Sequence, residues 1–96
     1  RAIAISDDEC ISIMIGEEDH LRIQVTVGGM SLEKAYEIAD SLDNELCDKL
    51  HFAYDSELGF LTECPTNIGT GLRASLMLHL PVIEARGAIS EITGAV

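Results

Sequence analysis

Residues 62–75 decide how this chain is interpreted, because they concentrate unusual residue types in one short segment. They read Thr62-Glu63-Cys64-Pro65-Thr66-Asn67-Ile68-Gly69-Thr70-Gly71-Leu72-Arg73-Ala74-Ser75. The proline and the two glycines exclude a regular element, so the sequence predicts a loop. A thiol in a glycine-bearing loop, with an arginine beyond it, suits an anion or nucleotide site. The same residues also suit a tight turn around a buried cysteine.

A hairpin is predicted upstream of this loop. Residues 10–15 form a short β-branched run that Gly16 ends, and residues 20–27 alternate polar with apolar positions. The acidic residues 17–19 between the two runs favour an antiparallel turn. The second strand then has one apolar face and one polar face. The polar face is formed by Arg22, Gln24 and Thr26.

The middle of the chain predicts one long helix and a second hairpin. Ser31 is a suitable N-cap, and apolar residues at steps of three and four continue after it for about twenty residues. Two short strands, at 51–54 and 58–62, flank a turn that contains aspartate and serine.

The last third of the chain predicts a strand and a helix. Residues 72–80 alternate as a strand does, Pro81 ends the alternation, and a shorter helix follows, weakened by Gly87 and Gly94. These elements together predict an α+β fold, a mainly antiparallel sheet with helices packed on one face. The opposite face would be a floor for a polyanionic ligand. It would carry Arg22, Gln24, Arg73, Ser75 and His79.

Composition and charge limit the class of protein and its partners. The 96 residues suit one small domain, and an apolar fraction of 47% excludes a disordered chain. With 17 acidic and 6 basic residues the formal charge is −11, which argues against a nucleic-acid partner. No apolar run approaches the ~18 residues of a membrane span, so no membrane partner is expected either. The chain begins without methionine, and we expect it to be a piece of a larger protein.

The cysteines favour neither a disulfide framework nor a metal centre. Cys10, Cys47 and Cys64 are odd in number and lack CxxC spacing, and the three histidines lack the spacing of metal ligands. We therefore predict no protein-bound metal and a reducing, cytoplasmic location. Cys10 and Cys47 are expected to be small buried residues.

Three successive carboxylates, Glu17, Glu18 and Asp19, precede His20 and Arg22. An acidic surface turn explains them, and so does a cation site. The ligand spacing of a calcium loop is absent, whereas the planar fork of a guanidinium suits paired carboxylates. The chain also lacks a Walker A pattern and a GxSxG nucleophile elbow. A guanidinium therefore remains a candidate cation for this turn.

Two motifs give the chain a resemblance to a known family. Residues 64–70, Cys-Pro-Thr-Asn-Ile-Gly-Thr, resemble the signature of the ATP:guanido phosphotransferases, the phosphagen kinase superfamily. Residues 16–22 resemble a second hallmark of that family, Asn-Glu-Glu-Asp-His-Leu-Arg, with Gly16 in place of the asparagine. The two motifs occur in the family's order and at its spacing. Residues 70–81 are most similar to the bacterial protein-arginine kinases.

The resemblance implies both a fold and a function. Residues 1–96 would be a single domain, the central part of a guanido kinase catalytic domain of the glutamine synthetase-like type. The activity would be ATP-dependent phosphoryl transfer to a guanidinium nitrogen of arginine residues in proteins, with Mg²⁺ bridging the phosphates. ATP and protein arginine side chains would be the partners, in the cytoplasm of a bacterium.

The resemblance also implies roles for individual residues. Glu18 would orient the substrate guanidinium and accept its proton. Cys64 would face the guanidinium as a thiolate, stabilised by the Thr66 hydroxyl. Glu17 and Asp19 would complete the guanidinium pocket, Asp19 through a metal-bound water. The residues that would bind ATP are Arg22, Arg73, Ala74, Ser75, Leu76 and Met77.

Two alternatives remain open. A kinase of small guanidines, of the arginine or creatine type, would carry the same motifs, and a non-catalytic module could use the fold to bind arginine or phosphoarginine. The presence of both Glu18 and Cys64 argues against the module, because a binder does not need both a base and a thiol. The family's upstream arginine motif and its downstream mobile loop are missing from these residues. We therefore expect the 96 residues alone to fold, but with little kinase activity and weak ATP affinity.

Overall fold

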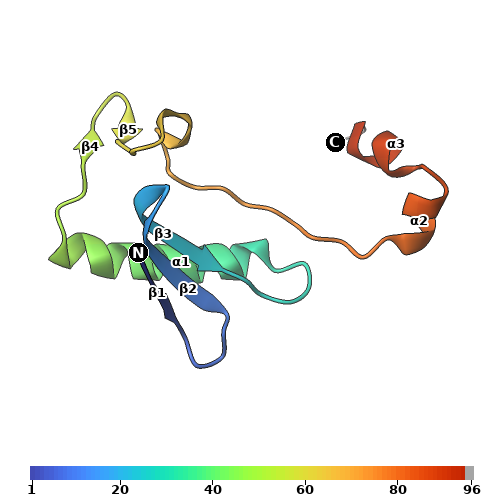
Figure 1. Cartoon of the computed structure of the whole chain (residues 1–96), viewed down its shortest axis with the longest axis horizontal. Helices are drawn as coiled ribbons and strands as arrows, with labels where there is room; N and C mark the ends of the chain where they lie inside the picture. The colour runs from blue at the N-terminus through green and yellow to red at the C-terminus, as the bar shows by residue number, and fades with distance from the viewer. Residues whose placement is uncertain (95–96) are drawn as a thin grey trace.

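Residues 1–94 are described by a computed structural model, and they form an α+β arrangement (Figure 1). The elements in chain order are β1 (Ala2–Ile5), β2 (Ile11–Glu17), β3 (Asp19–Val25), α1 (Leu32–Lys49), β4 (Tyr54–Asp55), β5 (Gly59–Phe60), the 3₁₀ helix η1 (Pro65–Asn67), α2 (Pro81–Ala85) and α3 (Ile89–Gly94). All strand pairs are antiparallel in the described part. The predicted fold class is therefore confirmed.

The larger sheet has the strand order β1-β2-β3. Side chains of directly opposite residues share a face, and Ile13 lies opposite both Ala4 and Ile23, so one face is apolar. The other face is polar along β3 and apolar along β1. It carries Arg22, Gln24, Ser12, Met14, Ile3 and Ile5.

A very tight turn joins β2 to β3. Glu17 pairs with Asp19, so Glu18 alone forms the tip, with a φ of +62°. Gly16 has a φ of +74°, a left-handed conformation that glycine adopts without steric cost. The prediction that Gly16 ends the strand is wrong, because this residue bends the backbone while the pairing continues to Glu17.

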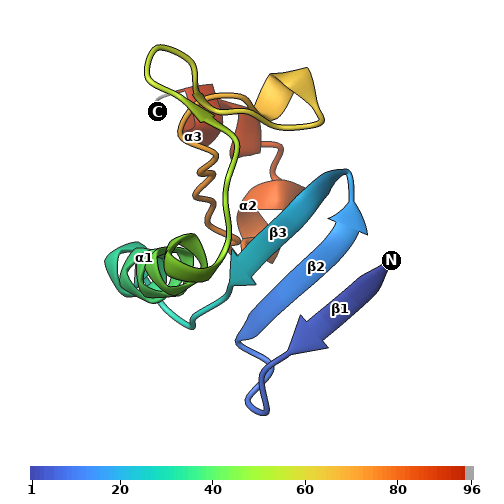
Figure 2. The ribbon, with the colours of Figure 1, turned by 90° about the vertical axis from the view of Figure 1, so that its left-hand side faces the viewer.

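The helix α1 lies beside β3 (Figure 2). It begins after Ser31 as predicted, although the Ser31 side chain makes no capping hydrogen bond. Along β3 the apolar residues are half-buried and the polar ones from His20 to Gln24 are exposed. The predicted amphipathic helix and the two-faced strand are thus both confirmed.

None of the described residues is fully buried. Ile3 and Ile5 remain 57% and 56% exposed on the second face of the sheet. Cys10 is half-buried and Cys47 is exposed, so the expectation that both are buried is wrong. Cys47 lies off the apolar stripe of α1, where its thiol is 4.0 Å from the Asp43 carboxylate. Within residues 1–94, no helix combines the length and hydropathy that crossing a membrane requires.

The second predicted hairpin is present but shorter than expected. The strands β4 and β5 have two residues each, and the Asp55 carboxylate accepts hydrogen bonds from the N–H groups of Glu57 and Leu58 at 2.8 and 3.0 Å. These two bonds lower the pKa of Asp55 below its ordinary value, and the bond from the Leu58 N–H has the larger effect. The turn chemistry of aspartate therefore sets this hairpin.

Phe60 anchors the following loop to this small sheet. Its ring meets those of Phe52 and Tyr54 edge-on, with centroids 6.3 and 5.2 Å away. Its backbone pairs with Gly69, exchanging hydrogen bonds of 2.8 and 3.2 Å. Gly59 lies so close to Gly69 that a Cβ there would collide with the Gly69 carbonyl. The loop that carries Cys64 therefore begins and ends beside β5.

Residues 72–80 do not form the predicted strand. They run as an extended segment that leaves the sheet and belongs to no strand ladder among residues 1–94 (Figure 1). Alternating polar and apolar residues give a strand one polar and one apolar face. A strand also needs a neighbouring strand edge, because its backbone N–H and C=O groups require hydrogen-bond partners. The expectation that Arg73, Ser75 and His79 share a sheet face with Arg22 is therefore wrong for this structure.

The predicted final helix is divided into two short ones. Pro81 occupies the first turn of α2, as expected for a residue without an N–H. Gly87 has a φ of +68° and separates α2 from α3. Gly94 is the last residue of α3 and does not interrupt it.

Candidate functional site

The two parts of the chain that carry the motifs meet at one carboxylate. Asp19, the first residue of β3, accepts a hydrogen bond from the backbone N–H of Cys64 at 3.1 Å. Its other oxygen accepts a hydrogen bond from the Asn67 side-chain amide at 2.7 Å. The partners lie 45 and 48 residues away along the chain, so the contact is tertiary. We call these three residues, Asp19, Cys64 and Asn67, the carboxylate clasp.

Local hydrogen bonds fix the loop around Cys64. The Thr62 hydroxyl donates to the Cys64 carbonyl at 2.7 Å, and the Asn67 N–H donates to the same oxygen at 3.0 Å. The Cys64 sulfur lies 3.0 Å from the Thr66 hydroxyl. Pro65 starts η1, where its missing N–H is not needed.

A second contact lies directly beside the clasp. His20 Nδ1 is 2.8 Å from the Glu63 carboxylate, and both side chains are at least half exposed. The hairpin residues 19 and 20 thus contact the loop residues 64 and 63 in antiparallel order. Such an exposed pair contributes only about 0–1 kcal/mol, but it extends the alignment of the loop with β3.

The three successive carboxylates of the turn point to three different partners. Glu17 contacts Arg1 at 3.5 Å, and Glu18 contacts Arg22 at 3.5 Å. Asp19 holds the clasp. Glu17 and Glu18 therefore each bind a guanidinium of the chain itself, a cation whose planar donors suit a carboxylate.

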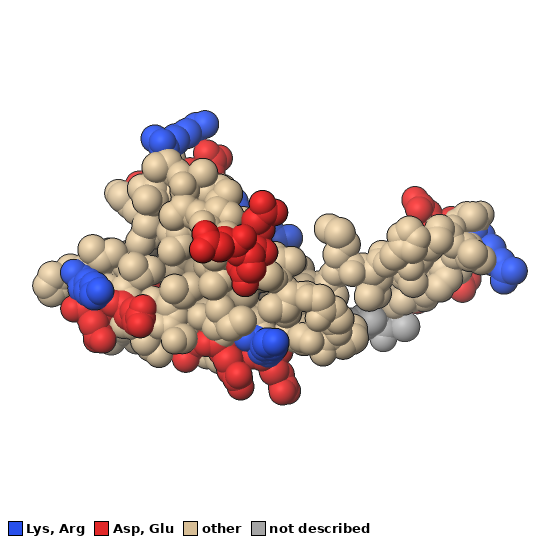
Figure 3. Space-filling view, turned by 90° about the horizontal axis from the view of Figure 1, so that it is seen from below, with Lys and Arg blue, Asp and Glu red and all other residues tan. Residues whose placement is uncertain are grey.

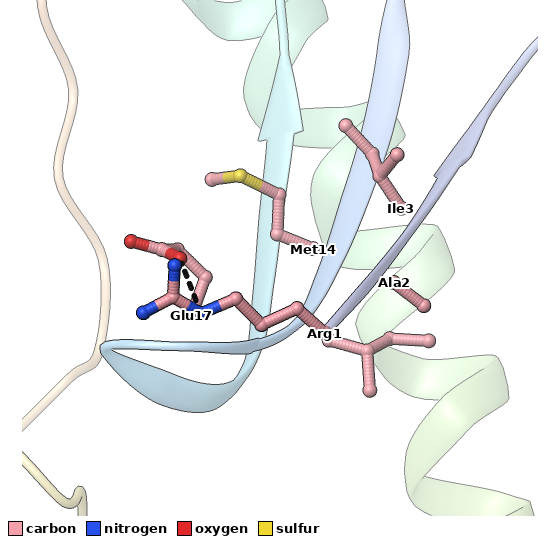
Figure 4. A pocket seen from close by; sticks show the side chains of 6 residues that line it. Arg1, Ala2, Ile3, Met14 and Glu17 are labelled. Carbon is pink, nitrogen blue, oxygen red and sulfur yellow. Dashed lines mark ion pairs between the residues drawn. The ribbon is translucent and has the colours of Figure 1, made fainter.

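The contact between Arg1 and Glu17 borders a shallow hollow of about 260 Å³ (Figure 4). The hollow is lined by Arg1, Ala2, Ile3, Met14, Ile15 and Glu17. Glu18 and Cys64 are not among its lining residues, so it is separate from the clasp. The candidate site is instead an open surface between the hairpin tip and the Cys64 loop.

The clasp stabilises the ionised form of Asp19. The backbone N–H of Cys64 and then the amide of Asn67 lower the pKa of the Asp19 carboxyl, because both donors stabilise the charged form. The Glu63 N–H and the His20 charge act in the same direction, and only partial desolvation opposes them. Asp19 is therefore a hydrogen-bond acceptor at neutral pH, and it cannot act as a proton donor there.

The structure does not bring the predicted phosphate side to this surface. Arg22 lies at the site, where it pairs with Glu18, but Arg73 makes no hydrogen bond or ion pair within residues 1–94. Residues 74–77 continue the same exposed extended segment. Among the residues predicted for the guanidinium, Asp19 contacts Cys64 and Cys64 contacts Thr66, whereas Glu17 and Glu18 bind Arg1 and Arg22.

The residues present offer no protein-built metal centre. No group of three histidine, cysteine or carboxylate side chains in residues 1–94 could hold an ion. Both oxygens of Asp19 already accept hydrogen bonds. Mg²⁺ commonly binds through phosphates and waters with only one or two carboxylates, so these residues fit an ion carried by a nucleotide, with no dedicated cage.

Charge and exposure also describe what can approach the site. Acidic side chains outnumber basic ones on the face shown in Figure 3, as the formal charge of −11 requires. An acidic surface attracts cationic ligands and raises their rate of encounter. The open turn of Glu17 and Glu18 is thus accessible to a long cationic side chain.

Sequence reasoning missed two residues of this site. Asn67 lies within the motif of residues 64–70 and Glu63 directly precedes it, but the motif alone predicts no role for either. The available signal was chemical: an amide donor and an acid that flank a cysteine in one loop complement an Asp-His pair in another. Only the fold could show that the two loops meet.

The comparisons with known proteins agree with the two motifs. The family model of the ATP:guanido phosphotransferase C-terminal catalytic domain matches residues 1–96. A protein-arginine kinase of Symbiobacterium thermophilum is 58% identical over 83 residues, which are 86% of this chain and 24% of the relative. Those of Halothermothrix orenii and Clostridium kluyveri are both 50% identical, over 100% and 98% of this chain and 28% and 27% of their own.

The chain thus spans about a quarter of the curated relatives that it matches, with 24–28% of their lengths covered. The match of the family model covers every residue, including both motifs and the clasp between them. This chain belongs to the ATP:guanido phosphotransferase family, as part of its C-terminal catalytic domain.

Proposed function

We propose that this chain is the central part of the catalytic domain of a kinase that transfers phosphoryl groups from ATP to arginine residues of proteins. The similar proteins named above are protein-arginine kinases, and the family name specifies ATP and a guanidino acceptor. The single observation that carries the proposal is the clasp, because it brings the hairpin turn that contains Glu18 into contact with the distant loop that contains Cys64.

Glu18 is proposed as the base. A protonated guanidinium has a pKa above ~12 and lacks a usable lone pair, so its attack on phosphorus requires removal of a proton. The N–P bond forms as the bond between the γ-phosphorus and the ADP oxygen breaks, and the proton passes to the Glu18 carboxylate. Glu18 already holds the Arg22 guanidinium at 3.5 Å. Since both side chains are over 40% exposed, a substrate guanidinium can replace Arg22 at small cost.

Cys64 is proposed to face the guanidinium from the other side. As a thiolate it would stabilise the cation and orient it, with the Thr66 hydroxyl at 3.0 Å as its hydrogen-bond partner. Glu17 and Asp19 support the same surface, Glu17 as a second carboxylate and Asp19 through the loop. The role of Cys64 is electrostatic, so no covalent phosphocysteine is formed.

The nucleotide side is proposed to comprise Arg22 and residues 73–77, namely Arg73, Ala74, Ser75, Leu76 and Met77. Arginine suits phosphate because its planar donors bind two oxygens at once. Mg²⁺ on the phosphates would neutralise charge that develops during transfer. Arg22, once released from Glu18 by a substrate guanidinium, is free to bind the phosphates, which couples the two halves of the site.

The chemistry also bears on the location and on activity in isolation. Free thiols at Cys10, Cys47 and Cys64 suit a reducing bacterial cytoplasm. Residues 73–77 lie in an exposed segment outside any helix or strand, so we expect the 96 residues alone to have little kinase activity and weak affinity for ATP.

The proposal is tested with the full-length protein and ATP labelled at its γ-phosphate. An arginine-rich protein and free arginine are offered separately, and a protein with lysine in place of arginine is the control. We expect label on the arginine-rich protein alone, with a phosphorus NMR signal of an N–P bond. Equal labelling of free arginine would indicate a small-guanidine kinase, and binding of phosphoarginine without transfer would indicate a non-catalytic module.

A further inference from the structure

We propose that Asp19 and Asn67 are positioning residues, which hold Cys64 at a fixed place relative to Glu18. This inference rests on the proposed function and deepens it. It gives Asp19 a role through the Cys64 loop, in place of one at a metal-bound water. It also gives Asn67 a role in the reaction, which acts through its contacts with Asp19 and Cys64.

The argument starts from the covalent neighbourhood of Asp19. Asp19 follows Glu18 directly, so its carboxylate is tied to the base by one peptide bond. One oxygen accepts the backbone N–H of Cys64 at 3.1 Å. A main-chain donor moves with the cysteine itself, so this bond fixes the position of Cys64 irrespective of the thiol rotamer. The base and the thiol are therefore joined through a single carboxylate.

The second oxygen of Asp19 explains how Asn67 contributes to the clasp. The Asn67 amide donates to it at 2.7 Å, and the Asn67 N–H donates to the Cys64 carbonyl at 3.0 Å. Asn67 thus contacts both Asp19 and Cys64, which closes a ring of three residues. Such a ring prevents the carboxylate from rotating, so the Cys64 contact keeps its direction.

The surroundings show why the loop needs this support. None of the described residues is buried, so apolar packing does not immobilise the Cys64 loop. Beyond the clasp, its tertiary ties are the His20–Glu63 pair at 2.8 Å and the backbone pairing of Gly69 with Phe60. The clasp is the part of this set that touches Cys64 itself. A shift of about 1 Å at a reacting group can lower a rate about 100-fold, so loss of the clasp has a measurable consequence.

The test exchanges the two side chains of the clasp. In the full-length protein, Asp19→Asn retains an acceptor for the Cys64 N–H but turns an amide donor toward the Asn67 donor. Asn67→Asp places two carboxylates together. The double exchange D19N/N67D restores a donor opposite an acceptor with the direction reversed, since the amide now at position 19 can donate to the carboxylate now at position 67 while its oxygen accepts the Cys64 N–H. We expect each single variant to lower kcat about 10- to 100-fold with KM for ATP unchanged, and the double exchange to recover most of that loss.

A second readout does not depend on the kinase reaction. The alkylation rate of Cys64 by iodoacetamide is measured by mass spectrometry relative to that of Cys47, which is exposed on α1. We expect a several-fold change in this ratio for D19N and N67D, and a return to the wild-type ratio in the double exchange. If D19N or N67D folds poorly, Asn67→Ala serves as a substitute because it only deletes a donor. It should change the alkylation ratio in the same direction as N67D.

The chain provides a matched control. Asn44 donates to Asp40 at 3.5 Å on the outer face of α1, which is the same pair of residue types outside the site. Asn44→Asp should leave both kcat and the alkylation ratio unchanged. An effect of N44D equal to that of N67D would overturn the proposal, because general charge would then explain the result.

The remaining outcomes separate this inference from the proposed function. One outcome is that D19N lowers kcat, that the double exchange does not restore kcat, and that the alkylation rate of Cys64 does not change. In that case Asp19 acts elsewhere and the inference is wrong. If no protein in the series transfers phosphate, the proposed function is wrong. The alkylation ratio then still decides whether the clasp holds Cys64.

Discussion

Two regions of this chain carry the two halves of the predicted site, and the structure treats them differently. The hairpin tip and the Cys64 loop are joined by the clasp and by the His20–Glu63 pair. Residues 70–80 carry Arg73 and extend away without a strand partner in the described part (Figure 1). Both regions have clear sequence patterns, so pattern alone does not explain the difference.

The difference lies in how each region satisfies its polar groups. In the Cys64 loop, the backbone N–H and carbonyl of Cys64 form hydrogen bonds with only a few residues, namely Thr62, Asn67 and the distant Asp19. A strand such as residues 72–80 requires a continuous edge that offers a matching donor or acceptor at every second residue. The alternation of polar and apolar residues predicts the strand, but it does not provide a neighbouring strand edge. A loop motif can thus bind a distant segment through a few hydrogen bonds where an unpaired strand motif cannot.

The largest expected effect tests the assembled region. Replacement of Glu18 by Gln in the full-length protein should lower kcat about 1,000-fold, because a general base contributes about 10²–10⁴-fold and the amide cannot accept the proton. The rate of phosphoryl transfer to an arginine-rich protein measures this. Glu37→Gln, on the exposed part of α1, is the control and should retain full activity. A decrease of less than about threefold for E18Q would mean that Glu18 is not the base.

The next effect concerns the thiol. Cys64→Ser keeps a partner for the Thr66 hydroxyl but removes the thiolate charge, so we expect kcat to fall about 100-fold, as when one electrostatic group of a transition state is lost. Steady-state kinetics measure the decrease, and Cys47→Ser on α1 is the matched control. Intact mass during turnover should show no phosphate on the wild-type cysteine. Full activity of C64S would remove the thiol from the mechanism.

A smaller effect is expected from the unassembled region. Arg73→Ala should raise KM for ATP about tenfold, since one charge-assisted contact to phosphate is worth about 1.5 kcal/mol or more. The melting temperature should change by only about 2 °C or less, because exposed substitutions rarely alter stability further. Titration with ATP and a thermal scan test both parts. A large loss of stability with unchanged ATP affinity would show that Arg73 has a structural role.

The smallest effect is a shift in titration. The clasp lowers the pKa of Asp19, so its stabilisation is complete above the ordinary carboxyl pKa of about 4 and is lost as pH falls through the lowered value. Asn67→Ala should raise the pKa of Asp19, which NMR of the carboxyl carbons can follow. Asp55, held by Leu58 and Glu57, is the internal control and should not move. An unchanged pKa of Asp19 in this variant would mean that the contact with the Asn67 amide is absent in solution.

Much of the fold follows from sequence because the relevant forces are local. The alternation from Leu21 to Val25 gives a two-faced strand, and the turn at Asp55 forms because its side chain binds the next backbone donors. Exposure could not be predicted with the same success. Cys47 was expected to be buried, yet its position on the helix circumference leaves it open. Composition predicts which residue types prefer the interior, but position in the fold decides which residues reach it.

The sequence by itself determined the family, the helix and the hairpins, and the residue types of a guanidinium site, because motifs and periodicity are written along the chain. The tertiary structure decided which of those residues meet. It joined Asp19 to Cys64 and Asn67, gave Glu17 and Glu18 separate arginine partners, and left Arg73 apart from Arg22. The physical reason is that hydrogen bonds between distant residues depend on how the backbone closes in space, and linear spacing does not encode that directly.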